Sequence, residues 1–120
     1  MPQSRPVPIS DLGRANNRFR EQVLQGRPGH HRILSTQGIQ ALGQVAVQEI
    51  LYLVLSFKEE DFREEFEPHG DRDFISAIYK GMKVWAKIDT YDTTLEWMSP
   101  DPADDAVTVR VLTILLPEDY

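Results

Sequence analysis

The sequence predicts an α+β fold in which N-terminal helices pack on one face of a three- or four-stranded antiparallel sheet. Apolar residues in the first half of the chain recur at three- and four-residue steps, which is the spacing of a helix. From Phe74 onward the period changes to two, which is the spacing of a strand. We therefore expect a single α+β domain over residues 10–120, preceded by a flexible arm over residues 1–9 that holds three prolines.

Two helices are expected in the first half. Ser10 is a favourable N-cap for a helix over residues 11–25, and Gly26 is a natural stop. The apolar stripe of this helix consists of Leu12, Ala15, Phe19 and Val23. Residues 44–57 are apolar on nearly every side, which predicts a central core helix buried on more than one face.

Shorter elements are expected around these helices. Residues 31–34 fit either a strand or an extended connector, and residues 35–42 fit a short helical turn. Residues 59–65 are compatible with a solvated helix that ends before Pro68.

The second half predicts antiparallel strands. Residues 74–79 and 82–90 alternate between apolar and polar positions, and Lys80-Gly81 between them suits a two-residue hairpin turn. Residues 94–98 are a candidate third strand. Residues 107–116 are apolar at most positions and rich in β-branched side chains, which predicts a central strand.

The charge of the chain is distributed unevenly. Residues 1–58 carry seven basic and three acidic side chains, whereas residues 59–120 carry six basic and sixteen acidic ones. The acids form two clusters, over residues 59–73 and 89–105, and each cluster includes large apolar side chains. Because phosphate binding requires clustered Lys and Arg, this composition argues against direct nucleic-acid binding and favours a basic protein surface as partner.

Composition excludes several other classes of protein. The chain has no cysteine, which rules out disulfides, thiolate metal sites and cysteine nucleophiles. It contains no run of about 20 apolar residues that could span a bilayer, and no apolar N-terminal segment typical of a secretory signal. We expect a cytoplasmic protein that requires no cofactor and does not associate with a membrane.

Four stretches together resemble a small uncharacterised protein family of proteobacteria, a domain of unknown function common in alphaproteobacterial genomes, plasmids and phages. They are ILSTQGIQALG at 33–43, PHGDRDF at 68–74, WAKIDTYD at 85–92, and SPDPAD at 99–104 with TVRVLTI at 108–114. The resemblance extends over about residues 10–120, up to Tyr120. The chain departs from the family pattern at Arg72, where histidine is usual, and at Ile75, where glycine is usual, which argues against a histidine-rich site in that loop.

The resemblance implies a genomic context rather than a chemistry. A small acidic protein encoded on a mobile element is a candidate inhibitor of a host defence or nucleic-acid-handling complex, including an anti-CRISPR protein.

From the residues themselves, we expect a non-catalytic acidic protein-binding module. Aromatic side chains rimmed by carboxylates suit a basic partner, since aromatic residues often supply binding energy and charge supplies specificity and association rate. The expected binding residues are Glu64, Glu65, Trp85, Asp89, Tyr91, Asp92, Trp97, Asp101, Asp104 and Asp105.

Two alternatives remain open at this stage. A small metal-dependent or acid–base hydrolase would use His69, Asp71 and Asp89, with Asp73 and Asp92 nearby, although their spacing matches no specific ligand motif. The simpler interpretation of residues 68–73 is a turn whose carboxylates accept backbone hydrogen bonds. A homodimer formed through the hairpin or the last strand is a further possibility.

Overall fold

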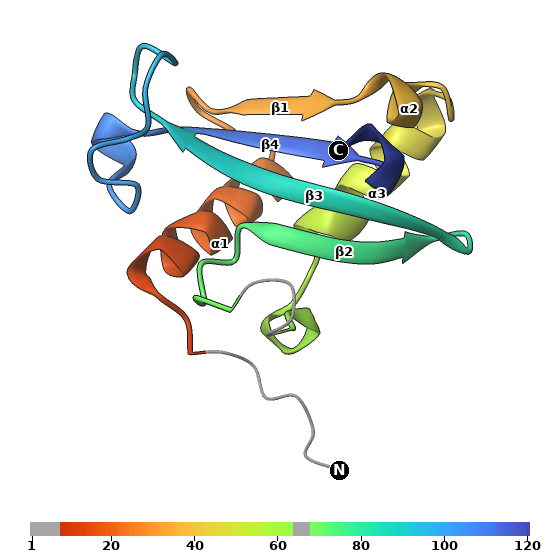
Figure 1. The fold of residues 1–120 in the computed structure, drawn as a ribbon, viewed down its shortest axis with the longest axis horizontal. Coiled ribbons are helices and arrows are strands. Elements are labelled where there is room, and N and C mark those ends of the chain that lie inside the picture. The colour runs from red at the N-terminus through yellow and green to blue at the C-terminus, as the bar shows by residue number, and fades with distance from the viewer. Residues whose placement is uncertain (1–7, 64–67) are drawn as a thin grey trace.

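The computed structural model of the chain describes residues 8–63 and 68–120 and confirms the α+β class (Figure 1). In chain order its elements are α1 (Asp11–Leu24), β1 (Arg32–Ser35), α2 (Gln37–Gln40), α3 (Gln44–Leu55), the 3₁₀ turn η1 (Glu59–Asp61), β2 (Phe74–Tyr79), β3 (Met82–Tyr91), η2 (Asp105–Val107), β4 (Val109–Leu115) and η3 (Pro117–Asp119). Most of the predicted arm, residues 1–7, lies outside the described residues.

The four strands form one sheet in the order β1-β4-β3-β2. The predicted hairpin is confirmed, since β2 and β3 pair antiparallel with Ala77 opposite Val84, and Gly81 takes a positive φ of 81° in the turn. The last strand is central, as predicted, because β4 lies between β3 and β1.

The prediction of a fully antiparallel sheet is corrected at one edge. β1 pairs parallel with β4, so that Arg32 lies opposite Val111 and Ser35 opposite Ile114. A parallel pair requires a long crossover between its strands. Here α2, α3 and the β2–β3 hairpin all lie between β1 and β4 in the chain, and they provide that crossover.

The α-helices cover one face of the sheet and leave the other without an α-helix (Figure 1). The covered face contributes alternate strand residues, such as Val84 and Ala86 of β3, to a core that includes Phe19 of α1 and Ile50 of α3. Successive strand residues point to opposite faces. The face without an α-helix therefore presents the other residues of β3, namely Trp85, Lys87, Asp89 and Tyr91. We call this second face the open face.

Helix α1 has the predicted cap and the predicted apolar stripe. The hydroxyl of Ser10 accepts a hydrogen bond from the backbone N–H of Gly13 at 3.0 Å. Ala15, Phe19 and Val23 are buried, and the last two belong to the core, whereas Leu12 is only partly buried. Asn16 and Arg20 of the same helix are also buried, which the apolar pattern does not predict.

The prediction of a core helix over residues 44–57 is confirmed, since α3 contributes Ile50, Val54 and Leu55 to the core, but the expected burial on more than one side is wrong. Ala46, Ile50 and Val54 of α3 are buried, but Val45 is 70% exposed and Tyr52 is 62% exposed. The reason is that the helices form a single layer on the sheet, so nothing among the described residues covers the outer side of α3.

Two further local predictions are also corrected. Residues 94–98 form a turn rather than a strand, and only one bridge, between Tyr91 and Met98, continues the pairing there. In residues 59–65, the described part forms only the 3₁₀ turn η1, after which Phe62 enters the core. Glu64 and Glu65 lie outside the described residues.

The loop before β2 lies directly against the N-terminus of α1. Gly70 accepts a hydrogen bond from the backbone N–H of Ser10 at 3.0 Å, and it takes a φ of 74°. A Cβ atom at Gly13 would overlap the carbonyl oxygen of Gly70, and a Cβ at Gly70 would overlap the carbonyl oxygen of Pro8. Both glycines therefore permit a backbone approach that no other residue allows.

None of the helices among the described residues is both long enough and apolar enough to cross a bilayer.

The contact between Gly13 and Gly70 predicts the effect of a single methyl group. Replacing Gly with Ala inside a helix normally stabilises it by up to about 1 kcal/mol. We expect Gly13→Ala instead to reduce the free energy of unfolding by about 1–3 kcal/mol, because the added carbon displaces the 68–72 loop. Urea denaturation measures the change. Arg18→Ala, at an exposed position of α1, is the control, and an equal or stabilising effect of Gly13→Ala would contradict the close approach.

Candidate functional site

The loop between β3 and β4 presents two large apolar side chains to solvent. Trp97 is 72% exposed and Met98 is 82% exposed. Both follow the turn at residues 92–96, which leaves β3 at its C-terminal end (Figure 1). We call residues 92–105 the end loop. Exposed aromatic and Met side chains of this kind are enriched where proteins bind other proteins.

The carboxylate of Asp92 organises the first part of the end loop. It accepts hydrogen bonds from the hydroxyl of Thr94 at 2.7 Å, from the backbone N–H of Thr94 at 3.1 Å, and from the backbone N–H groups of Glu96 and Trp97 at 3.3 and 3.4 Å. The backbone N–H of Asp92 in turn donates to the carbonyl of Trp97 at 2.8 Å. These contacts, led by the Thr94 hydroxyl, hold the pKa of the Asp92 carboxyl below its usual range.

The backbone of this turn is strained at one residue. Leu95 has a φ of 63°, in the left-handed region that a leucine rarely occupies. Such a conformation persists only where the surrounding contacts enforce it. The Asp92 hydrogen bonds on either side of Leu95 therefore fix the direction in which Trp97 and Met98 project.

The second part of the end loop is anchored by its own polar groups. The hydroxyl of Ser99 and that of Thr108 lie 2.7 Å apart, and Thr108 donates to the carbonyl of Asp101 at 2.9 Å. Asp104 caps η2 by accepting from the backbone N–H of Ala106 at 2.9 Å. The carboxylates of Glu96 and Asp101, by contrast, make no hydrogen bond or ion pair with any described residue, so they remain available to a partner.

Asp105 ties the end loop to the centre of the sheet. Its Oδ1 accepts from Nε of Arg110 at 3.1 Å and from Nη2 at 2.7 Å. Arg110 is fully buried, and its Nη1 donates to the side-chain oxygen of Asn16 at 3.0 Å. A buried guanidinium is tolerated only when it is paired, so this ion pair gives Asp105 a structural role.

The predicted binding residues therefore separate into two groups. Asp92, Trp97, Asp101, Asp104 and Asp105 lie on the end loop, whereas Trp85 and Asp89 lie on the open face. Tyr91, at the end of β3, lies between them and lines a hollow of ≈ 500 Å³ on the open face together with Asp89. Trp85 is six residues before Tyr91 on the strand, roughly 20 Å away at the usual rise.

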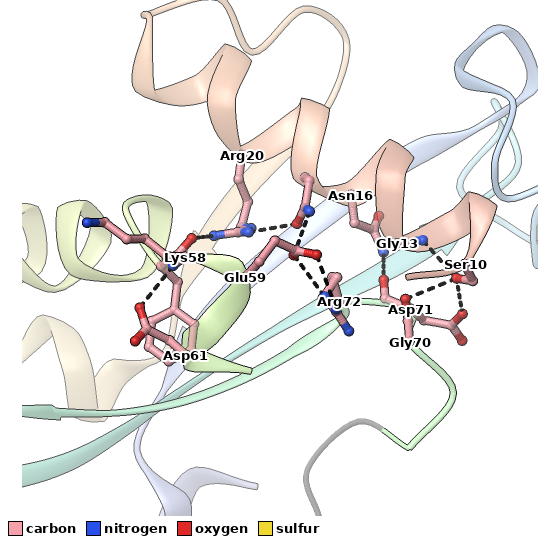
Figure 2. Close-up of polar contacts among 12 residues, drawn as sticks. Ser10, Gly13, Asn16, Arg20, Lys58, Glu59, Asp61, Gly70, Asp71 and Arg72 are labelled. Carbon is pink, nitrogen blue, oxygen red and sulfur yellow. Dashed lines mark hydrogen bonds and ion pairs between the residues drawn. The ribbon is translucent and has the colours of Figure 1, made fainter. Parts of the chain in front are cut away.

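Three carboxylates of the first acidic cluster fasten the chain (Figure 2). Glu59 binds the buried Arg72 through two hydrogen bonds, of 2.9 and 3.1 Å, which hold the pKa of the Glu59 carboxyl below its usual range. Asp61 accepts from the backbone N–H of Lys58 at 3.0 Å. Asp71 accepts from the hydroxyl of Ser10 at 2.7 Å. These carboxylates hold the segments around α1 together.

The residues of the predicted hydrolase site do not come together. Asp71 lies at the N-terminus of α1, on the helix side of the sheet, whereas the carboxylate of Asp89 lies on the open face, 3.2 Å from Nζ of Lys87. His69 is exposed in the loop before β2. Within residues 8–63 and 68–120, no three His, Asp or Glu side chains are grouped so that they could hold a metal ion.

Burial lowers the basicity of two further groups. His31 is buried beside Phe19, and its Nδ1 accepts the backbone N–H of Arg110 at 2.9 Å. Desolvation, with a smaller effect of the neighbouring His30, lowers the pKa of His31 to about 4. Desolvation likewise lowers the pKa of Arg20, whose guanidinium donates to carbonyls at the end of α3, to about 10.

Sequence reasoning missed the polar residues that hold the site in place. Asn16 and Arg110 are buried within otherwise apolar elements, and Arg72 is buried in a loop. The only local signal was a polar residue interrupting an apolar pattern, as at Arg110 in the last strand. Which partner such a residue meets depends on segments far away in the chain.

The Asp92 network predicts the behaviour of the end loop. We expect Asp92→Ala to accelerate backbone hydrogen exchange at Glu96 and Trp97 several-fold, because the acceptor that orders both N–H groups is lost. Exchange in β4, away from the loop, should change little. The control is Glu21→Ala on α1, and unchanged exchange at Glu96 and Trp97 in Asp92→Ala would show that the carboxylate does not order the loop.

The buried His31 predicts a stability that depends on pH. Its folded pKa, about 4, lies below the value of about 6.5 expected in the unfolded chain, so the unfolded chain binds more protons between these values. The contribution of the neutral His31 to the free energy of unfolding is therefore complete above pH 6.5, and it is lost as the pH falls towards 4. We expect it to amount to about 1–3 kcal/mol.

The measurement is the free energy of unfolding of wild type and of His31→Asn at several pH values. Asn retains an acceptor near the position of Nδ1 but does not titrate. The difference between the two proteins should change between pH 6.5 and 4. A constant difference would mean that His31 titrates alike in the folded and unfolded chain.

Comparison with known proteins adds a family but no activity. The model of DUF3768, described as a protein of unknown function, matches residues 35–119. The match contains the end loop and nearly all of the sheet, whereas α1 and most of β1 precede it. No curated protein and no solved structure matches the chain. Since the matched residues are more than two thirds of its length, the chain belongs to the DUF3768 family.

Proposed function

We propose that this protein is a non-catalytic protein-binding module that docks on a basic protein surface through its end loop. The observation that carries the proposal is the exposure of Trp97 and Met98 at the tip of an ordered, acidic loop. Side chains of this size are costly to leave in water, and contact with a partner would bury them.

The charge around these side chains supports a basic partner. Residues 89–105 contain six acidic side chains and no Lys, Arg or His. Three of the six, Asp92, Asp104 and Asp105, are engaged in holding the loop, and Asp89 is paired with Lys87. Glu96 and Asp101 remain to meet cationic groups of a partner. Complementary charge of this kind increases the association rate and disfavours binding to phosphate.

The rigidity of the loop supports binding as well. Ordering a flexible loop on association would cost free energy, and a loop already held by internal hydrogen bonds avoids most of that cost. The contacts of Asp92 and the strained backbone of Leu95 maintain the exposed arrangement before any partner arrives. The loop therefore needs little rearrangement to present Trp97.

The partner that we propose is a host defence or nucleic-acid-handling complex, with the protein acting as an inhibitor in the manner of an anti-CRISPR protein. Proteins that bind nucleic acid carry basic surfaces for phosphate contacts. An acidic loop with an apolar tip would compete with nucleic acid for such a surface. The resemblance to proteins encoded on plasmids and phages supports this choice of partner.

The test is affinity capture from a lysate of the organism that encodes the protein, with three matched variants. We expect Trp97→Ala to lose at least about 2 kcal/mol of binding free energy, the size typical of a central interface residue. Glu96→Lys combined with Asp101→Lys should weaken capture and reduce its salt dependence. Tyr52→Ala removes another exposed aromatic ring, from α3, and should leave capture unchanged.

Salt concentration provides the second measurement. The Debye length falls from about 10 Å at 0.1 M salt to about 3 Å at 1 M, so charge-assisted binding should weaken markedly over this range. Glu21→Lys on α1 is the matched charge reversal away from the loop. A partner captured equally by wild type and Trp97→Ala, with no dependence on salt, would refute the proposal.

A further inference from the structure

The outer edge of β2 offers backbone groups to another strand. β2 lies at one edge of the sheet and pairs only with β3 (Figure 1). The carbonyl of Asp73 accepts from the N–H of Ile88 at 2.9 Å, and every second residue from there on faces β3 in the same way. The backbone groups of Ser76 and Ile78 therefore point outward. Within residues 8–63 and 68–120, no residue forms a hydrogen bond with them on that side.

The composition of β2 leaves this edge unprotected. Proteins usually protect an edge strand with a lysine, a proline, a bulge or a covering segment. β2 has the sequence FISAIY, without a charge, a proline or a glycine, and its register with β3 is regular over all six residues. A six-residue segment of this kind readily pairs with an identical copy of itself. The opposite edge differs, because β1 has only four residues and begins with Arg32.

Exposed apolar side chains lie beside the same edge. Ile78 of β2 is 60% exposed, and Val45 and Tyr52 of α3 are more exposed still. The three side chains line one hollow of ≈ 540 Å³ between α3 and β2. Exposed apolar side chains gathered in one patch are typical of a surface that another protein covers.

The charge of this surface favours a second copy of the chain as the occupant. The chain has a net charge of −6, so like charge opposes the approach of two copies at its acidic surfaces. The lining of the α3–β2 hollow holds one carboxylate, Glu49, and one ammonium group, Lys80. They lie 3.9 Å apart and balance each other. Two copies meet no net repulsion here, and a strongly basic partner would find no net attraction.

We propose that the chain forms a symmetric dimer in which β2 pairs antiparallel with β2 of a second copy. A twofold axis perpendicular to the sheet beside Ala77 places Ser76 opposite Ile78 of the second copy. In this register the outward N–H and C=O groups of both residues gain partners, and the two four-stranded sheets join into one. The axis also places both α3 helices on the same face of the joined sheet, where Val45 and Tyr52 face the second copy.

The dimer leaves the end loop of each copy exposed. β3 runs from the β2–β3 turn to the end loop, so the two lie at opposite ends of this strand (Figure 1). The inference therefore does not rest on the function proposed for the end loop. The last strand was the other candidate for self-pairing, but it offers no edge, because β4 lies between β1 and β3.

The first measurement is the mass of the intact chain by size-exclusion chromatography with light scattering. We expect twice the mass of one chain at about 0.1 mM, since interfaces of standard size dissociate at micromolar concentrations or below. Ile78→Lys places a charge at the exposed edge and should raise the dissociation constant at least about tenfold. Leu34→Lys is the matched control at an exposed position of β1, and it should remain a dimer.

Hydrogen exchange locates the interface. The backbone N–H groups of Ser76 and Ile78 point away from β3, so they exchange rapidly in a monomer and slowly in the proposed dimer. We expect their exchange to slow at least about tenfold as the concentration rises through the dissociation constant. The N–H of Ala77 faces β3 in both states and should change less. In Ile78→Lys, the N–H of Ser76 should exchange rapidly wherever the variant is a monomer.

Two outcomes would overturn the inference. One is a monomer at about 0.1 mM, which would leave the edge of β2 to an extended segment of another protein. The other is a dimer in which Ser76 and Ile78 exchange rapidly and which Ile78→Lys leaves intact, because its interface would then lie elsewhere. Neither outcome affects the docking proposed for the end loop, and failure to capture a partner through Trp97 would not affect the dimer.

Discussion

The buried side chain of Asn16 is the contact on which the arrangement of the segments depends. Its Nδ2 donates to the carbonyl of Asp71 at 2.8 Å, and its Oδ1 accepts from Arg110 at 3.0 Å. One amide thus joins α1 to the loop before β2 and to the central strand β4. Arg110 continues the connection to Asp105 in the end loop. Since each of these buried groups needs its partner, the loops must stay where α1 places them.

Several carboxylates in the acidic half of the chain have a structural role. A cluster of carboxylates in sequence suggests a single docking surface, but Glu59, Asp71 and Asp105 each bind a group of the protein itself. Two of these carboxylates neutralise buried guanidinium groups, and that of Asp71 fastens the N-terminus of α1. The surface that we propose for recognition is therefore smaller than the sequence suggests, namely the tip of the end loop with Trp97, Glu96 and Asp101.

Regular elements were predicted well because their signals are local. The period-two pattern and the Lys80-Gly81 turn were sufficient for the hairpin, and Ser10 with its apolar stripe was sufficient for α1. The prediction failed where the answer depended on neighbours. The apolar composition of residues 44–57 suggested burial on several sides, but only one layer of helices exists, so Val45 and Tyr52 are exposed. For the candidate site, the sequence identified both Trp85 and Trp97 as anchors. It did not indicate that Trp85 lies on the open face and Trp97 on the end loop.

The sequence alone determined the α+β class, the hairpin, the central last strand and the excess of carboxylates, because periodicity, turn residues and composition act within a few positions of the chain. Only the tertiary structure decided that β1 joins β4 in parallel, that Asn16 meets Arg110, and that Trp97 faces solvent on a loop held by Asp92. The first two of these features arise from contacts between residues up to 94 positions apart. Pairing at that separation is set by how the whole chain packs, and local patterns carry no record of it.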